Sequence, residues 1–385
     1  MQAVFNKLHG DRVIWAVVFI LSIISILAVY SSIVTLAYKY REGNTEYFLF
    51  KHGLILIVGF GLMYLTHNLP YKYYSRAAQV GLLAAIPLLL LTLVTGANIN
   101  EASRWLVIPV INQTFQTSDL AKLALIMYIA RVLSKKQDNI KDFKEAFLPV
   151  ILPIILVCGL ILPANFSTSA ILFTCSMILL FIGRIKVLHI FGLLFIGLIF
   201  LSTFVFIAYN SKDSGRLGTW KNRIENFTEG GSTVNYQAEQ SKIAIATGKT
   251  FGKKPGGSTQ RNFLPHPYSD FIYAIIVEEY GLIGGIGIIF LYLILLYRGI
   301  RISLKCPKTF GSLLSIGLSL SLVFQALINM AVAVNLLPVT GQPLPMVSMG
   351  GTSVWFTCIA IGIILSVSRE TEMLTNKNIQ VESNN

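Results

Sequence analysis

The chain has 385 residues, of which 54% are hydrophobic and 13% charged, and its mean hydropathy is +0.67. A soluble domain carries about a quarter charged residues, so this chain has too little polar surface for a water-soluble fold and must lie largely in lipid. The basic residues behind its net charge of +13 are scattered among apolar segments, which argues against a nucleic-acid-binding protein.

Apolar runs near the roughly 20 residues needed to cross about 30 Å of hydrocarbon recur along the whole chain. They lie at about 13–36, 49–67, 77–95, 118–133, 147–163, 168–183, 187–209, 277–298, 311–335 and 352–368. The sequence therefore predicts an all-α polytopic membrane protein with about ten transmembrane helices in a single domain, residues 1–385. The first run is too long for a cleaved signal peptide, so we expect a retained first span.

Lysine and arginine residues in the short connections predict the orientation of the spans. With the N-terminus in the cytoplasm, the connections on the inner side carry most of these residues, as the positive-inside rule requires. An even number of spans then places the C-terminus inside as well, with residues 369–385 as a cytoplasmic tail. The expected localisation is the cytoplasmic (inner) membrane.

Residues 210–270 form a connection too long to be a turn, between the seventh and eighth spans, and are expected on the extracytoplasmic side. Loops longer than about 15 residues are usually functional or disordered. This loop carries nine basic residues, Lys212, Arg216, Lys221, Arg223, Lys242, Lys249, Lys253, Lys254 and Arg261. Such cations could stabilise a pyrophosphate leaving group or could simply attract anionic lipid head groups.

Asp270 is the first candidate for chemistry, because it ends the segment Leu-Pro-His-Pro-Tyr-Ser-Asp and directly precedes an apolar helix. A carboxylate at this position commonly caps the free N–H groups of the helix. It could instead act as a general base in a half-buried cleft. The residues alone leave both interpretations open.

Other polar residues stand out against the apolar spans. Asp119 and Lys122, spaced i, i+3, could pair on one helix face and should face the bundle interior, since a charge exposed to lipid costs about 2.5–3.5 kcal/mol or more. The same argument applies to Glu278 and Glu279. Gln325 and Asn329, spaced i, i+4, are expected to form hydrogen bonds between helices.

Two further segments admit both a structural and a functional interpretation. Arg104 and Trp105 could belong to an interfacial aromatic belt or to the wall of a substrate groove. The stretch 252–259, which contains Ser258, lacks the lysine that a Walker A motif requires before its Ser-Thr pair. A turn whose backbone N–H groups approach a phosphate remains an alternative there.

Several segments together resemble the SEDS family (shape, elongation, division and sporulation proteins). Asn100-Glu-Ala-Ser-Arg-Trp105 and Phe115-Gln-Thr-Ser-Asp-Leu-Ala-Lys122 are similar to its N-G-A-x-R-W and Q-P-S-E-L-A-K segments, and Asn165-Phe-Ser-Thr168 to its D-F-G-T turn. Residues 264–274 with 278–281 resemble L-P-E-A-H-T-D-F-I-F-A and E-E-L-G, and residues 337–353 resemble L-P-x-x-G-x-x-L-P-x-x-S-Y-G-G-S-S. These segments follow the family's order over nearly the whole chain.

The resemblance implies an inverting peptidoglycan glycosyltransferase that polymerises lipid II at the outer face of the cytoplasmic membrane. The family's essential aspartate falls on Asp270, which would be the general base or a ligand of a divalent cation, Mg²⁺ or Mn²⁺. Substrate-binding positions are expected at Arg104, Trp105, Asp119, Lys122, Arg216, Lys221, Arg223, Lys254, Ser258, Arg261, Glu278 and Ser348. The expected partners are lipid II, a class B penicillin-binding protein (a transpeptidase), other divisome proteins and membrane lipids.

The sequence also departs from the family pattern. Thr117 replaces a proline, Asn165 an aspartate and Met349 a tyrosine, while His-Pro-Tyr-Ser replaces Glu-Ala-His-Thr before Asp270. The expected base, Asp270, is retained, but no role of that glutamate or histidine carries over to His266.

In its compact length and in the stretch 338–353, the chain resembles the cell-division (FtsW-like) branch of the family more than the elongation (RodA-like) branch. A lipid II flippase and a non-catalytic divisome scaffold are the alternatives from other classes. The flippase is disfavoured because the chain shows no internal repeat.

Overall fold

The structure is a computed structural model that describes residues 9–95, 97–99, 102–108, 113–210 and 235–383. A helix coincides with each apolar run predicted from the sequence. These helices are α2 (Arg12–Ser32), α4 (Thr45–Asn68), α5 (Tyr74–Thr95), α6 (Thr117–Lys135), α7 (Leu148–Ile161), α8 (Phe166–Ile182), α9 (Val187–Asn210), α12 (Ile272–Lys305), α13 (Thr309–Ala333) and α14 (Thr352–Ser383). The prediction of an all-α polytopic protein is therefore confirmed.

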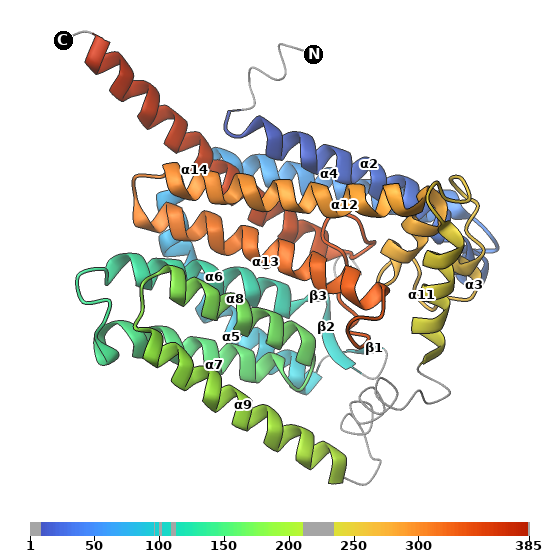
Figure 1. The fold of residues 1–385 in the computed structure, drawn as a ribbon, viewed down its shortest axis with the longest axis horizontal. Coiled ribbons are helices and arrows are strands. Elements are labelled where there is room, and N and C mark those ends of the chain that lie inside the picture. Colours follow the sequence, from blue (N-terminus) through green and yellow to red (C-terminus); the bar gives the residue numbers. More distant parts are fainter. Residues whose placement is uncertain (1–8, 96, 100–101, 109–112, 211–234, 384–385) are drawn as a thin grey trace.

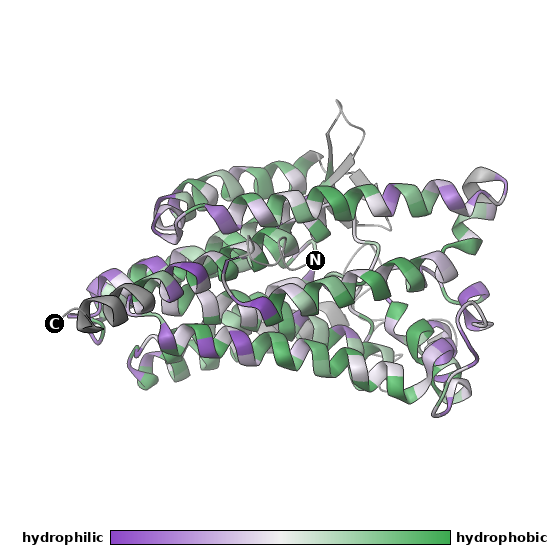
Figure 2. Cartoon of the chain, turned by 90° about the horizontal axis from the view of Figure 1, so that it is seen from above, coloured by the Kyte–Doolittle hydropathy of each residue, from purple (hydrophilic) through white to green (hydrophobic). Residues whose placement is uncertain are grey.

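Most of these helices are long and apolar enough to cross a membrane. Among the described residues, seven helical segments are long and apolar enough to cross a membrane, and α8 and α9 contain shorter apolar stretches. Figure 2 shows hydrophobic residues along the helices and hydrophilic residues gathered mainly toward the ends of the bundle. Two charged residues near the start of α6, Asp119 and Lys122, lie inside the bundle, whereas Lys135 at its end is exposed.

Both described chain ends lie toward the same end of the bundle, while the short elements that flank Asp270 lie toward the other end (Figure 1). This arrangement fits an even number of spans, and the side of the membrane on which each end lies stays a prediction. Helix α14 continues beyond the bundle, so much of the predicted tail, up to Ser383, is helical.

Short elements connect the helices, and they are α3 (Val34–Arg41), η1 (Tyr71–Tyr73), η2 (Phe143–Phe147), α11 (Asn235–Gly248) and η3 (Gln260–Asn262). A small antiparallel sheet of β1 (Ala97–Ile99), β2 (Ala102–Ile108) and β3 (Gln113–Gln116), in the order β1-β2-β3, lies between α5 and α6. The sequence analysis did not anticipate this sheet, because strands this short carry little periodicity.

The turn between α7 and α8 is tight, since α7 ends at Ile161 and α8 begins at Phe166. Asn165 precedes α8, and its side-chain Oδ1 accepts a hydrogen bond from Thr168 N at 3.3 Å. An asparagine at this position satisfies one of the N–H groups that a helix start leaves free. The replacement of the family aspartate therefore keeps a capping side chain at the start of α8.

Helix α12 is broken at Gly281, whose φ of 72° and ψ of −172° are not helical. The segment that follows α11 pairs with the broken turn: Lys253 N donates to Glu278 O at 2.9 Å, and Leu282 N donates to Lys249 O at 2.9 Å. Backbone groups that the break releases are thus satisfied by the outer loop, as the low-dielectric surroundings require.

We expect Gly281→Ala to lower the melting temperature of the detergent-solubilised protein. A Cβ atom there would lie 2.2 Å from Thr250 O and 2.5 Å from Gly252 N, and the positive φ adds strain of about 1–3 kcal/mol. The matched control is Gly287→Ala on the same helix, where a Cβ meets nothing within 4 Å. Equal melting temperatures for the two variants would contradict this account of the break.

Candidate active site

The turn that ends at Asp270, directly before the start of α12, presents a half-buried carboxylate. Ser269 Oγ donates to Asp270 Oδ1 at 2.7 Å, and among the described residues Oδ2 accepts no hydrogen bond. The N-cap of α12 is Phe271, and no side chain caps this helix. The capping interpretation therefore does not describe Asp270, whereas one fixed and one free oxygen are what a proton acceptor needs.

Three successive backbone carbonyls hold the same turn in place. Tyr268 O accepts from Met349 N at 2.9 Å, and Ser269 O accepts from Ser348 Oγ at 2.6 Å. Asp270 O accepts from Asn329 Nδ2 at 2.9 Å. The last outer loop is the connection between α13 and α14, residues 334–351. This loop and α13 thus fix the backbone on which the carboxylate stands, and Ser348, a predicted substrate-binding residue, is buried in this contact.

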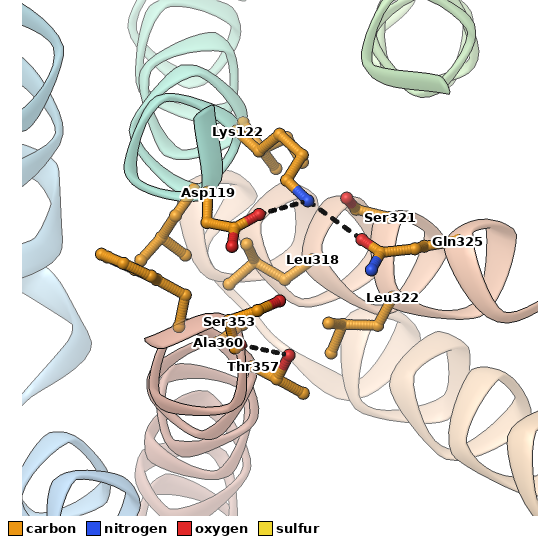
Figure 3. Close-up of a pocket in the computed structure, with 12 residues that line it drawn as sticks. Asp119, Lys122, Leu318, Ser321, Leu322, Gln325, Ser353, Thr357 and Ala360 are labelled. Atoms are coloured by element: carbon orange, nitrogen blue, oxygen red, sulfur yellow. Dashed lines mark hydrogen bonds and ion pairs between the residues drawn. The ribbon is translucent and has the colours of Figure 1, made fainter. Parts of the chain in front are cut away.

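Asp119 and Lys122 form an ion pair inside the bundle, as predicted (Figure 3). Lys122 Nζ lies 2.7 Å from Asp119 Oδ1, with side chains 11% and 4% exposed respectively. Lys122 Nζ also donates to Gln325 Oε1 of α13 at 3.0 Å. Both residues line a cavity of about 40 Å³ between α6, α13 and α14, which has room for water but not for a sugar in this conformation.

Polar side chains of α13 continue from this pair toward Asp270. Gln325 Nε2 donates to Pro343 O at 3.0 Å, and Asn329, one turn further on, donates to Gln342 O at 2.7 Å. Gln325 thus forms the predicted interhelical hydrogen bond, with Lys122 of α6. Both Gln325 and Asn329 also donate to the last outer loop. Gln342, which the sequence analysis did not single out, reaches Thr168 Oγ1 on α8 at 2.7 Å.

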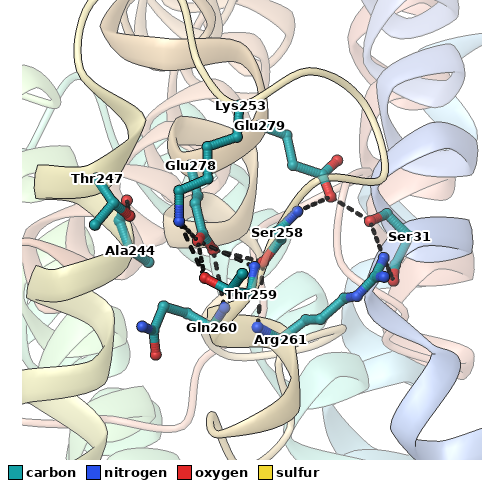
Figure 4. A network of polar contacts seen from close by, with 10 residues as sticks. All are labelled: Ser31, Ala244, Thr247, Lys253, Ser258, Thr259, Gln260, Arg261, Glu278 and Glu279. Atoms are coloured by element: carbon teal, nitrogen blue, oxygen red, sulfur yellow. Dashed lines mark hydrogen bonds and ion pairs between the residues drawn. The ribbon is translucent and has the colours of Figure 1, made fainter.

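Glu278 is fully buried and anchors the end of the long outer loop (Figure 4). Its carboxylate accepts from Lys253 Nζ at 2.7 Å, Ser258 Oγ at 2.5 Å, and both the backbone N and the hydroxyl of Thr259 at 3.1 and 3.0 Å. Gln260 N adds a longer bond at 3.3 Å. Two predicted substrate-binding residues, Glu278 and Ser258, are therefore bonded to each other.

Glu279 and Arg261 tie the same loop to the end of α2. Glu279 Oε1 accepts from Ser258 N at 3.3 Å and from the hydroxyl of Ser31, and Arg261 Nη1 donates to Ser31 O at 3.0 Å. Arg261 is thus held within the protein, whereas the side chain of Lys254 is exposed.

The remaining predicted positions fall at the sheet or beyond it. Trp105 is half-buried on β2, where its backbone lies opposite Ala97 and Gln116. Arg104 is in the same strand, but its side chain lies outside the described part of the structure. Arg216, Lys221 and Arg223 also lie outside the described residues.

We expect Glu278→Gln to loosen the outer loop, because an amide nitrogen would replace one oxygen that accepts from several donors. A lost hydrogen bond to a buried charge costs about 1.5–3 kcal/mol. Hydrogen–deuterium exchange over residues 249–261 should rise in this variant. The exposed carboxylate Asp138, changed to Asn, provides a control that should exchange like the wild type. Unchanged protection in Glu278→Gln would show that the network does not anchor the loop.

A metal at Asp270 would have few protein ligands. In the described ranges, no group of three or more His, Cys, Asp or Glu side chains could hold a metal ion. Mg²⁺ is commonly bound through one or two carboxylates together with substrate phosphates and water. The single half-buried carboxylate of Asp270 fits that mode but not a site built from protein ligands alone.

The fold and this turn define a polytopic helical membrane protein with a polar turn that carries a half-buried carboxylate, directly before α12. A family model described as "Cell cycle protein", covering FtsW, RodA and SpoVE, matches residues 11–373, and the chain belongs to this family.

Curated relatives match over nearly the full chain. Stage V sporulation protein E of Bacillus subtilis (strain 168) is 32% identical over 377 residues, which cover 94% of this chain and 98% of that protein. A probable peptidoglycan glycosyltransferase FtsW of Geobacter sp. (strain M18) is 33% identical over 364 residues, covering 93% and 96%.

Solved structures show the same fold. One, described as structural coordination of polymerization and crosslinking by a peptidoglycan synthase complex, contains a chain that matches with a TM-score of 0.72 and 25% identity over 94% of this chain and 98% of that one. The rod shape determining protein RodA of Thermus thermophilus matches with a TM-score of 0.67 and 23% identity, covering 95% and 98%.

Proposed function

We propose that this protein is a peptidoglycan glycosyltransferase that polymerises lipid II into glycan strands at the outer face of the cytoplasmic membrane. The observation that carries the proposal is the Asp270 carboxylate, which has one oxygen fixed by Ser269 and, among the described residues, one without a partner. Relatives named as glycosyltransferases and similarity to a chain of a peptidoglycan synthase complex support the same reaction class.

In this reaction Asp270 accepts the proton of the acceptor sugar's 4-hydroxyl. The hydroxyl oxygen then bonds to the anomeric carbon of the donor, while the bond from that carbon to the undecaprenyl pyrophosphate breaks and its electron pair leaves with the pyrophosphate. Displacement from the opposite face inverts the anomeric configuration. A positioned general base contributes about 10²–10⁴-fold to such a step.

Cations must balance the negative charge that grows on the leaving pyrophosphate. Among the described basic residues of this loop, Lys242, Lys249 and Lys254 are exposed, whereas Lys253 and Arg261 are held by Glu278 and Ser31. Arg104, Arg216, Lys221 and Arg223 are proposed to assist. In the alternative role, Asp270 would hold a Mg²⁺ or Mn²⁺ ion, which would supply further positive charge there.

The lipid surroundings fit a substrate with a polyprenyl tail. Each buried CH₂ group contributes about 0.8 kcal/mol to membrane anchoring, so the protein needs only to orient the polar head groups. We further propose a class B penicillin-binding protein as partner, with both chain termini in the cytoplasm. The relatives named FtsW favour the division branch over the elongation branch.

Transport of lipid II across the membrane is the rival that can be separated most clearly. Proteoliposomes holding the protein and its class B partner would receive fluorescent lipid II in one leaflet, and both glycan formation and accessibility to a membrane-impermeant quencher would be followed. Polymer without translocation above protein-free vesicles supports the proposal. Translocation without polymer would assign a flippase, and neither activity would point to a scaffold.

A further inference from the structure

We propose that Asn329 is a positioning residue that sets where the Asp270 carboxylate stands. The catalytic part of this proposal rests on the proposed function. Asn329 lies on α13, is 1% exposed, and uses the hydrogens of its amide on two backbone carbonyls, Asp270 O at 2.9 Å and Gln342 O at 2.7 Å. It contacts the main chain of Asp270 rather than the carboxylate, so its influence on the reaction passes through the backbone.

The contact between this turn and α13 is apolar on either side of the hydrogen bond that the Asn329 amide donates to Asp270 O. Phe271 and Leu264 flank the turn and are buried in one cluster with Val332 of α13, against which Ile328 also packs. Apolar contacts of this kind are not directional. The hydrogen bond from Asn329 therefore supplies a directional constraint on the backbone carbonyl of Asp270.

The second carbonyl makes Asn329 a junction between two segments that are distant in sequence. Gln342 belongs to the last outer loop, which is also held by Thr168 on α8 and by Gln325 on α13. The same loop donates to the carbonyls of Tyr268 and Ser269. The backbone carbonyls of Tyr268, Ser269 and Asp270 thus each accept a hydrogen bond. Asn329 donates both to Asp270 O and to Gln342 O, so it links the turn to the last outer loop.

The two hydrogen bonds of Asn329 form a clamp between the turn and the last outer loop. This clamp matters because Asp270 stands on a turn without a helix cap. A catalytic group must be held within about 0.5 Å of its productive geometry, and a shift of about 1 Å can cost about 10²-fold in rate. Loss of the Asn329 amide releases the carbonyl of Asp270 and the loop beside it, so the free oxygen of the carboxylate is no longer held against the acceptor hydroxyl.

The test is Asn329→Leu in the full chain, assayed for lipid II polymerisation with its cognate class B penicillin-binding protein. Leucine keeps the volume and removes both donors. We expect kcat to fall by about 10–10²-fold, while KM for lipid II stays within about twofold because Asn329 does not touch substrate. Ser348→Ala, which frees the neighbouring carbonyl, should lower kcat in the same way if the leucine variant fails to fold.

Ser315→Ala is the matched control, since it removes one buried hydrogen bond from α13, to Gly299 O at 3.1 Å, at a site nearer the helix start. It should lower stability without lowering kcat. An equal loss of kcat in Ser315→Ala, a wild-type kcat in Asn329→Leu, or a raised KM at unchanged kcat would overturn the positioning role.

Hydrogen–deuterium exchange separates this inference from the proposed reaction. Exchange over residues 264–271 and 342–349 should rise together in Asn329→Leu and stay unchanged in Ser315→Ala. If the wild type forms no glycan but exchange responds in this way, the proposed function fails and the clamp stands. Unchanged exchange in Asn329→Leu overturns the clamp whatever the activity.

Discussion

Asp270→Asn should fold and bind lipid II but lose glycan polymerisation by about 10²–10⁴-fold, the usual contribution of a general base. Asparagine keeps an oxygen that can accept from Ser269 Oγ, and the half-buried position tolerates a neutral side chain. What it lacks is an oxygen that can take a proton. The initial rate with labelled lipid II, measured in the complex with the class B partner, checks this expectation.

Two controls make this result interpretable. Asp138→Asn removes an exposed carboxylate elsewhere in the chain and should keep the wild-type rate. Chelation of divalent cations then separates the two roles of Asp270: full wild-type activity without metal assigns a base, and activity lost but restored by Mg²⁺ or Mn²⁺ assigns a metal ligand. A folded Asp270→Asn protein with a normal rate would show that both assignments are wrong.

Lys122→Met should destabilise the protein by about 3–5 kcal/mol, the usual effect of breaking a buried ion pair from one side. Asp119 is 4% exposed and its Oδ1 lies 2.7 Å from the lysine amine, so methionine would leave its charge buried without that partner. Gln325 would lose a donor in the same step. Denaturant-induced unfolding of the reconstituted protein measures the loss.

The double variant Asp119→Asn with Lys122→Met is the control for this effect. It removes both charges, and neutral replacement of a whole buried pair is often close to neutral for stability. We expect it to recover most of the stability that Lys122→Met loses. If the single variant unfolds like the wild type, the pair is hydrated rather than buried, and the cavity beside it is wider than the structure shows.

Features set by local composition could be predicted from the sequence. Apolar runs of membrane-spanning length located the helices, and the i, i+3 spacing of Asp119 and Lys122 predicted their pairing because it follows from helix geometry alone. The break of α12 at Gly281 was not predicted, since a glycine in an apolar run has many uses. Its backbone partners lie in a loop about thirty residues earlier, where no local pattern points to them.

The candidate active site could likewise be predicted from the sequence only in part. Asp270 was identified from its segment, but the charges of the long loop alone could not distinguish cations bound to substrate from cations bound within the protein. Lys253 turned out to bond to Glu278, and Arg261 to Ser31. Asn329 was recognised as a polar residue in an apolar span, but its partner carbonyls belong to two loops whose approach only the tertiary structure provides.

Formation of glycan from lipid II as the sole substrate tests the central claim most directly. The purified protein would be combined with a class B penicillin-binding protein whose transpeptidase serine has been replaced, so that crosslinking cannot obscure the products. The account predicts a ladder of uncrosslinked glycan strands and release of undecaprenyl pyrophosphate. A well-folded complex that binds lipid II yet leaves it unpolymerised would contradict it.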